Sequence, residues 1–142
     1  MRDEVFLDTS FIYALSDMAD PVHPVVSSTH EALERPPVLT SYVLAEAMSL
    51  LTKRATKHRA VVVGDRIVTS SQARVIRPTD EDFDDAWALF AKYPDWDFDL
   101  VDAISFALMK REEIETALTF DSHFSQMGFE TMPGMTNNRA DA

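Results

Sequence analysis

Short apolar runs alternate along this chain with longer amphipathic segments, and this alternation restricts the fold more than any other feature. The apolar runs predict strands at residues 5–7, 38–39, 75–76, 117–120 and 129–132. The amphipathic segments predict helices at about 20–33, 41–55, 79–90 and 99–111. Strands that are apolar throughout and separated by helices are typical of a parallel sheet covered on both faces. The sequence therefore predicts an α/β fold with a central parallel sheet between two helical layers.

Two parts of the pattern are less simple. The segment 58–71 is open between two interpretations, because the valine run 61–63 favours a strand while its spacing with Ile67 and Val68 fits a helix. Aromatic residues gather further along the chain, and they are candidate stacking surfaces for unpaired bases. They are Trp87, Tyr93, Trp96 and Phe98. Trp87 falls on the apolar stripe of its predicted helix, which indicates a core position.

Length and composition exclude several classes of protein. The 142 residues predict one domain, and we expect it to span 1–132, followed by a loose tail at 133–142. The chain has no cysteine, which excludes disulfides, thiolate zinc sites and cysteine nucleophiles. Its three glycines are too scattered for a phosphate-cradling loop. No apolar run approaches the roughly 18 residues that span a bilayer, so we expect a cytoplasmic protein without a membrane partner.

Charge is distributed unevenly along the chain. The net charge of −11 argues against nonspecific adhesion to nucleic acid. Residues 53–77 nevertheless carry seven basic residues and one acidic residue. Candidate contacts to an RNA backbone in this stretch are Lys53, Arg54, Lys57 and Arg59. The alternative, that these side chains only solvate helix faces, remains open.

Four acidic residues occupy positions that converge in a parallel sheet. Asp8 follows the first predicted strand and Asp121 follows a later one, so both lie at the carboxyl edge, where open parallel sheets bind ligands. Glu46 lies about one turn into the helix after the second strand. Asp102 lies in the first turn of the last long helix. Carboxylates from four distant segments can therefore meet at one point.

Converging carboxylates repel one another, so such a cluster requires a cation or shared protons. Oxygen ligands without a thiolate favour Mg²⁺ or Mn²⁺ over zinc. A divalent ion held in this way activates water and stabilises the leaving oxygen in phosphodiester hydrolysis. Each acid also has a structural interpretation. Asp8 and Asp121 could cap the helices that follow them, and Asp102 could belong to a capping box opened by Asp99.

The residues around these acids resemble the motifs of a known family, the PIN-domain ribonucleases, and most closely its VapC-type toxins. Residues 5–11 resemble the opening strand with the first catalytic Asp, and residues 40–46 resemble the second motif, which ends in Glu. Residues 99–107 and 119–124 are similar to the third and fourth motifs. The resemblance extends over residues 4–132 with the motifs in the same order and at the same spacing.

This resemblance implies a PIN-like three-layer α/β/α sandwich that cuts single-stranded or structured RNA with Mg²⁺ or Mn²⁺. It implies that Asp8, Glu46, Asp102 and Asp121 are the catalytic and metal-binding acids, and that Ser10 supports the first of them. It further implies a homodimer that a cognate antitoxin silences by placing its tail in the acidic site.

The chain departs from the family pattern at two positions. His123 stands where some members carry a further acid, which leaves a second metal ion open. We expect His123 to pack beside the site or to support its acids rather than to act in catalysis. Asp99 stands where small hydroxyl residues are frequent, and it either adds a ligand or caps its helix.

We therefore expect a metal-dependent endoribonuclease that is the toxin of a toxin–antitoxin pair. Two other functions fit parts of the pattern. A catalytically silent module that binds RNA or protein would keep the same fold, although the intact set of four acids argues against it. A Mg²⁺-binding phosphoacceptor domain would need paired acids after the first strand and a lysine ending a late strand, and the chain has no lysine beyond Lys110.

Overall fold

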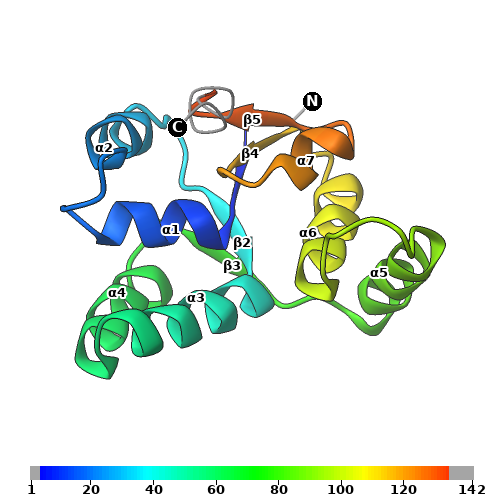
Figure 1. Cartoon of the computed structure of the whole chain (residues 1–142), viewed down its shortest axis with the longest axis horizontal. Helices are drawn as coiled ribbons and strands as arrows, with labels where there is room; N and C mark the ends of the chain where they lie inside the picture. The colour runs from blue at the N-terminus through cyan, green and yellow to red at the C-terminus, as the bar shows by residue number, and fades with distance from the viewer. Residues whose placement is uncertain (1–3, 135–142) are drawn as a thin grey trace.

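The computed structural model describes residues 4–134, which form one sheet of five parallel strands (Figure 1). The strands are β1 (Val5–Leu7), β2 (Val38–Thr40), β3 (Arg74–Ile76), β4 (Thr116–Leu118) and β5 (Glu130–Met132). Each predicted strand is present, with ends that differ by at most two residues. The order β3-β2-β1-β4-β5 changes direction between β1 and β4. Loops diverge at such a point, so the carboxyl ends of these two strands border a crevice.

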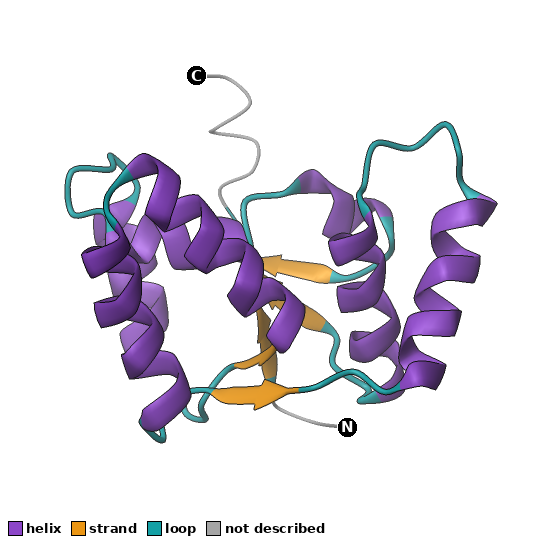
Figure 2. Ribbon diagram, turned by 90° about the horizontal axis from the view of Figure 1, so that it is seen from below, coloured by secondary structure: helices purple, strands orange, loops and turns teal. Residues whose placement is uncertain are grey.

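Seven helices surround the sheet in the described part of the chain. They are α1 (Thr9–Ser16), α2 (His23–Glu31), α3 (Ser41–Arg54), α4 (Lys57–Thr69), α5 (Asp80–Lys92), α6 (Leu100–Arg111) and α7 (Ser122–Gln126). Helices α1 to α4 lie to one side of the sheet and α5 to α7 to the other (Figures 1 and 2). The predicted α/β/α sandwich is therefore confirmed. None of the helices within residues 4–134 has the length and apolar character needed to cross a membrane.

The segment that the sequence left open, 58–71, belongs largely to helix α4. The side chain of Thr56 caps this helix by accepting a backbone N–H from its first turn. Gly64 is buried against α3, where an added Cβ would lie 2.8 Å from the sulfur of Met48. Val61, by contrast, is 50% exposed. The valine run is therefore one turn of a helix that buries its small residues, and it is not a strand.

The structure differs from the prediction in two further respects. Residues 9–16 and 122–126 form α1 and α7, which the apolar pattern did not separate from the strands before them. Trp87 is 53% exposed, so its predicted core position is wrong. Helix α5 packs mainly against α6 and buries Ala86 there, while Trp87 contacts Phe90 on its own helix. A helix with one main neighbour leaves part of its apolar stripe outside.

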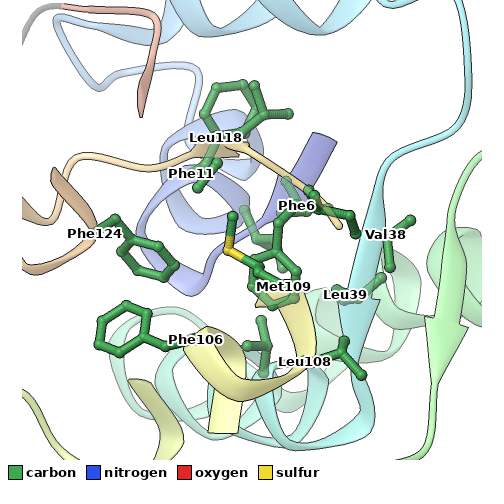
Figure 3. Close-up of a cluster of buried hydrophobic side chains, with 14 of the residues drawn as sticks. Phe6, Phe11, Val38, Leu39, Phe106, Leu108, Met109, Leu118 and Phe124 are labelled. Atoms are coloured by element: carbon green, nitrogen blue, oxygen red, sulfur yellow. The ribbon is translucent and has the colours of Figure 1, made fainter. Parts of the chain in front are cut away.

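The hydrophobic core fixes the edge of the sheet where the acids lie. Figure 3 shows side chains from the sheet facing those of α6 and α7. The labelled residues include Phe6, Val38, Leu39, Leu118, Phe106, Leu108, Met109 and Phe124. The rings of Phe106 and Phe124 meet edge to face with centroids 4.9 Å apart. Leu7, which is buried, directly precedes Asp8, so core packing determines where this carboxylate lies.

The strand order also bears on the phosphoacceptor alternative. Receiver-type phosphoacceptor domains have the order 2-1-3-4-5. The sheet here has the order β3-β2-β1-β4-β5, and Asp8 at the end of β1 is followed by Thr9 and Ser10 rather than by a second acid. The fold therefore does not support this alternative.

Candidate active site

The four acids singled out in the sequence meet at the carboxyl end of the sheet. Asp8 directly follows β1, Asp121 follows the end of β4, Asp102 lies in the first turn of α6, and Glu46 lies in α3. Burial raises the pKa of Asp8, Glu46 and Asp102, and the negative charge of Asp121 adds to the rise in all three. Repulsion between charges weakens with distance, so a charge that raises the pKa of three other acids must lie near all of them. The four acids therefore form one electrostatic cluster.

Asp8 is the most deeply buried of the four acids, with 5% of its surface exposed. Its Oδ2 accepts hydrogen bonds from the hydroxyls of Thr119 at 2.8 Å and Ser10 at 3.0 Å. The oxygen of Ser10 in turn accepts the backbone N–H of Phe120 at 3.0 Å. Ser10 therefore contacts Asp8 as expected and ties the end of β1 to the chain after β4. Asp8 makes no side-chain cap to α1, so capping does not explain it.

The protonation of Asp8 reflects this enclosed position. Burial raises its pKa from 3.8 to about 6, although hydrogen bonds from the Thr119 hydroxyl, the Thr9 backbone and the Ser10 hydroxyl favour the ionised form. The loss of hydration disfavours the charged carboxylate more than these hydrogen bonds stabilise it. A cation placed beside this carboxylate would reverse that balance, because it would stabilise the ionised form.

Asp102 is at once part of a helix cap and part of the acidic cluster. Its N–H donates to Oδ1 of Asp99 at 2.9 Å, and the N–H of Asp99 donates to Oδ2 of Asp102 at 3.1 Å. Asp99 thus takes the capping role, one of its two predicted roles. Burial and then the charge of Asp99 raise the pKa of Asp102 to about 8. A solvent-exposed cap at a helix N-terminus would have the opposite shift, so capping alone does not explain this carboxylate.

Asp121 and His123 complete one side of the cluster. Asp121 caps α7, because its Oδ1 accepts the backbone N–H of His123 at 2.9 Å. The ring Nδ1 of His123 lies 2.7 Å from the same Oδ1 and 3.8 Å from Oδ2 of Asp102. This nitrogen is buried and lacks a hydrogen bond of acceptable geometry. Ligand atoms from Asp102, Asp121 and His123 all lie within 4.8 Å of one another, an arrangement that can hold a metal ion.

Glu46 approaches the cluster from α3. The hydroxyl of Thr9 donates to its Oε1 at 2.6 Å. Burial raises the pKa of Glu46 despite this hydrogen bond, and the charges of Asp99 and Asp121 add to the rise. Since Thr9 is the residue after Asp8, the hydrogen bond connects α3 to the same corner of the sheet.

The basic residues suggested for RNA contact lie at the opposite end of α3. Lys53 and Arg54 end this helix, and Lys57 and Arg59 begin α4. Lys53 lies seven positions after Glu46 along this helix, a rise of roughly 10 Å along the axis. The guanidinium of Arg54 lies over the Tyr13 ring at 5.4 Å, and that of Arg59 donates to the Ser16 carbonyl. These two arginines therefore also serve packing against α1.

Comparison with known proteins identifies the family. The model of the PIN domain matches residues 5–130 of this sequence. The chain belongs to the PIN-domain family. The family predicted from the four motifs is therefore confirmed.

Relatives of this PIN domain include a characterised toxin. The 23S rRNA-specific endonuclease VapC20 of Mycobacterium tuberculosis is 36% identical over 126 residues, which cover 88% of this chain and 95% of VapC20. The crystal structure of VapC20, a sarcin–ricin loop cleaving toxin, aligns with a TM-score of 0.83 at 29% identity over 89% of this chain and 96% of that chain. VapBC2 from Rickettsia felis, bound to a DNA fragment from its promoter, aligns with a TM-score of 0.69 at 15% identity over 89% of this chain and 96% of that chain. The latter likeness shows the shared PIN fold alone.

Two hydroxyl residues of this PIN-domain site, Thr119 and Thr9, were not among the candidates predicted from the sequence. Thr119 bridges two acids, because its hydroxyl donates to Asp8 and accepts the backbone N–H of Asp121 at 2.9 Å. Thr9 holds an acid from another helix. His123, expected to pack beside the acids or to support them, approaches two of the carboxylates directly. The available signal was adjacency, since each of these residues lies within two positions of a motif acid.

Proposed function

We propose that this PIN-domain protein is a divalent-metal-dependent endoribonuclease and the toxin of a toxin–antitoxin pair. The observation that carries the proposal is the cluster of Asp8, Glu46, Asp102 and Asp121, in which burial and mutual repulsion raise the pKa of three members. Such a cluster is unfavourable unless a cation binds to it or its members share protons, and an ion is what phosphodiester hydrolysis would use. The relative VapC20 is a 23S rRNA-specific endonuclease, which supports RNA cleavage as the reaction. An RNA substrate in turn favours a cytoplasmic location.

The donor set fits Mg²⁺ or Mn²⁺. Asp102 and Asp121 offer oxygen, and the buried Nδ1 of His123 offers a nitrogen whose hydrogen-bonding capacity is otherwise unused. A nitrogen ligand shifts the preference from Mg²⁺ towards Mn²⁺, because Mg²⁺ binds nitrogen poorly. When bound, the ion supplies Lewis acidity, which neutralises charge on the scissile phosphate and lowers the pKa of water. Asp8, held by Ser10 and Thr119, would complete the ligand set.

The protein's own residues would position the RNA. Asp8, oriented by two hydroxyls, and Glu46, oriented by Thr9, both belong to the carboxylate cluster and can accept protons from an attacking water. The phosphates beyond the cleavage point would lie along α3 towards Lys53 and Lys57, whose side chains are exposed. With few basic groups available, RNA binding should be modest and should weaken with salt.

A cleavage assay tests the proposal. A sarcin–ricin hairpin RNA is a reasonable first substrate because VapC20 cleaves that loop, and total cellular RNA with end mapping is the second. We expect cutting with Mg²⁺ or Mn²⁺, none with EDTA, and a loss of at least about 100-fold in Asp8→Asn and Asp121→Asn. Asp65→Asn, an exposed acid on α4, serves as the matched control and should cut normally. Metal-independent cutting, or full activity in Asp8→Asn, would refute the assignment.

The same assay separates the silent-module alternative. A silent module would bind RNA without cutting it under any metal condition. The antitoxin and homodimer remain proposals, which co-expression with any short open reading frame that neighbours the gene and light scattering of the purified protein would test. Suppression of cleavage by the co-expressed protein would support the antitoxin, and a mass of one chain would exclude the homodimer.

A further inference from the structure

A shallow hollow of about 360 Å³ adjoins the carboxylate cluster. It is lined by Asp95, Trp96, Asp97, His123 and Gln126, so it joins the loop between α5 and α6 to helix α7. His123 belongs to both places, because its Nδ1 approaches the cluster while its side chain lines the hollow. A group seated in the hollow therefore lies one side chain away from the acids.

Trp96 gives this hollow an aromatic wall. Its side chain is 41% exposed, yet its ring packs against Tyr93, with ring centroids 4.6 Å apart, and against Phe98 at 6.3 Å. Phe98 is 3% exposed and anchors this group in the core. The Trp96 backbone N–H also donates to the Tyr93 carbonyl at 3.1 Å. An exposed ring that is already held in place loses little conformational entropy when a planar ligand stacks on it.

The acids around the hollow restrict what that planar ligand can be. Asp95 and Asp97 flank Trp96 and are exposed. Their carboxylates repel phosphate, so the hollow suits a base and not the RNA backbone. Ionised carboxylates only accept hydrogen bonds. Guanine alone among the four bases presents two neighbouring N–H donors, at N1 and N2, whereas the other three place an acceptor beside each donor on that edge.

We propose that this hollow binds an unstacked guanine next to the scissile phosphate. The base stacks on Trp96 and donates from N1 and N2 to Asp95 or Asp97, while its phosphate lies at the carboxylate cluster beyond His123. This inference rests on the proposed nuclease function and extends it to a preferred base. An RNA substrate necessarily presents a base beside each phosphate that enters the cluster, which favours a base over a protein side chain as the occupant.

Tryptophan fluorescence provides a direct binding test. The chain has two tryptophans, so Trp87→Phe leaves Trp96 as the sole reporter. In this variant with Mg²⁺ present, 5′-GMP should quench the fluorescence at a concentration about 10-fold lower than AMP, CMP or UMP. Asp97→Asn combined with Asp95→Asn should remove this preference, and Asp65→Asn on α4 should not. Equal quenching by all four nucleotides, or none, would overturn the proposal. Stronger quenching by N-acetylarginine amide than by GMP would mean that the hollow receives a cationic side chain.

Cleavage of short RNAs gives the second test. The substrates differ at one position, with guanine replaced by inosine, which lacks only the 2-amino group, or by adenine. We expect kcat/KM to fall about 10-fold on either replacement. Trp96→Leu should cut the three RNAs equally, and Trp96→Phe should retain most of the preference because it keeps an aromatic face. If Trp96→Leu folds normally and still prefers the guanine substrate as strongly as the wild type, the proposal is overturned.

The two proposals fail in different ways. If the wild type cuts RNA with metal but shows no preference for guanine, the nuclease function stands and the guanine site is wrong. If GMP quenches Trp96 selectively but no RNA is cut, the guanine site stands and the nuclease function is wrong.

Discussion

Replacing Asp8 by asparagine should stabilise the metal-free protein at neutral pH while it abolishes cleavage. Asp8 is almost fully buried, and burial raises its pKa to about 6 from an ordinary value of 3.8. Asparagine has nearly the same shape. Its side-chain oxygen can take the place of Oδ2 and accept the same two hydrogen bonds from Ser10 and Thr119. The substitution therefore removes the charge while these two hydrogen bonds can be kept.

The size of the effect follows from the pKa. The folded protein binds the Asp8 proton more tightly than the unfolded chain by about two pKa units, which corresponds to about 3 kcal/mol. Because the folded pKa is the higher one, this contribution to stability is present below about pH 4 and is lost as the pH rises to about 6. The free energy of unfolding of Asp8→Asn should thus exceed that of the wild type by about 3 kcal/mol at pH 7.5, and the two values should be almost equal at pH 4.

Urea unfolding in EDTA, followed by circular dichroism at pH 4, 5.5 and 7.5, measures this difference. The control is Asp82→Asn. Asp82 is also buried, but the hydrogen bonds from Arg111 and Thr79 outweigh the effect of burial and lower its pKa. Asp82→Asn should therefore destabilise the protein at pH 7.5, and its effect should diminish in acid. The two substitutions change stability in opposite directions although both remove a buried carboxylate.

Two results would refute this reasoning. A loss of stability in Asp8→Asn at every pH, as a damaged core produces, would mean that burial does not disfavour the charge. A gain that is the same at pH 4 and pH 7.5 would exclude ionisation as its cause. Added Mn²⁺ should raise the melting temperature of the wild type more than that of Asp8→Asn, because a cation bound to the folded state stabilises it.

Three further predictions concern other contacts. Thr9→Val removes the hydroxyl that donates to Glu46 but keeps the shape of the side chain, so kcat should fall about 10- to 100-fold with little change in melting temperature. An unchanged kcat would mean that Thr9 does not position Glu46. Arg111→Met removes the partner 2.6 Å from Asp82, and urea unfolding at pH 7 should show a loss of roughly 2 kcal/mol that diminishes in acid; a pH-independent loss would contradict this. Lys53→Gln should reduce the slope of log K for RNA binding against log salt by roughly one; an unchanged slope would exclude Lys53 from phosphate contact.

The positions of the acids could be predicted because they depend on local patterns. Asp8 follows an apolar strand, and the carboxyl ends of parallel strands lie at one edge, so its place in the fold follows from its place in the sequence. Asp99 could be placed similarly, because a capping box is a pattern of four successive positions. Local rules of this kind also predicted the sheet and the helices α2, α3, α5 and α6, but not α4, whose segment was left open between strand and helix.

The contacts between the acids and their supporting side chains could not be predicted in the same way. The hydrogen bond from Thr119 to Asp8 joins residues 111 positions apart, and that from Thr9 to Glu46 joins residues 37 apart. No periodicity encodes which hydroxyl meets which carboxylate. The exposure of Trp87 has a related cause, since an apolar stripe predicts one buried face but not how much of it a neighbouring helix covers.

Each strand of this sheet is three residues long, so little separates the core from the reacting groups. The buried Leu7 and Leu118 stand one residue before Asp8 and Thr119. A change of side-chain volume at either leucine displaces a neighbour that holds the acidic cluster together. Drift during evolution should therefore be slower at these two positions than in the outer helices, and variants there should lose turnover before they lose the folded state.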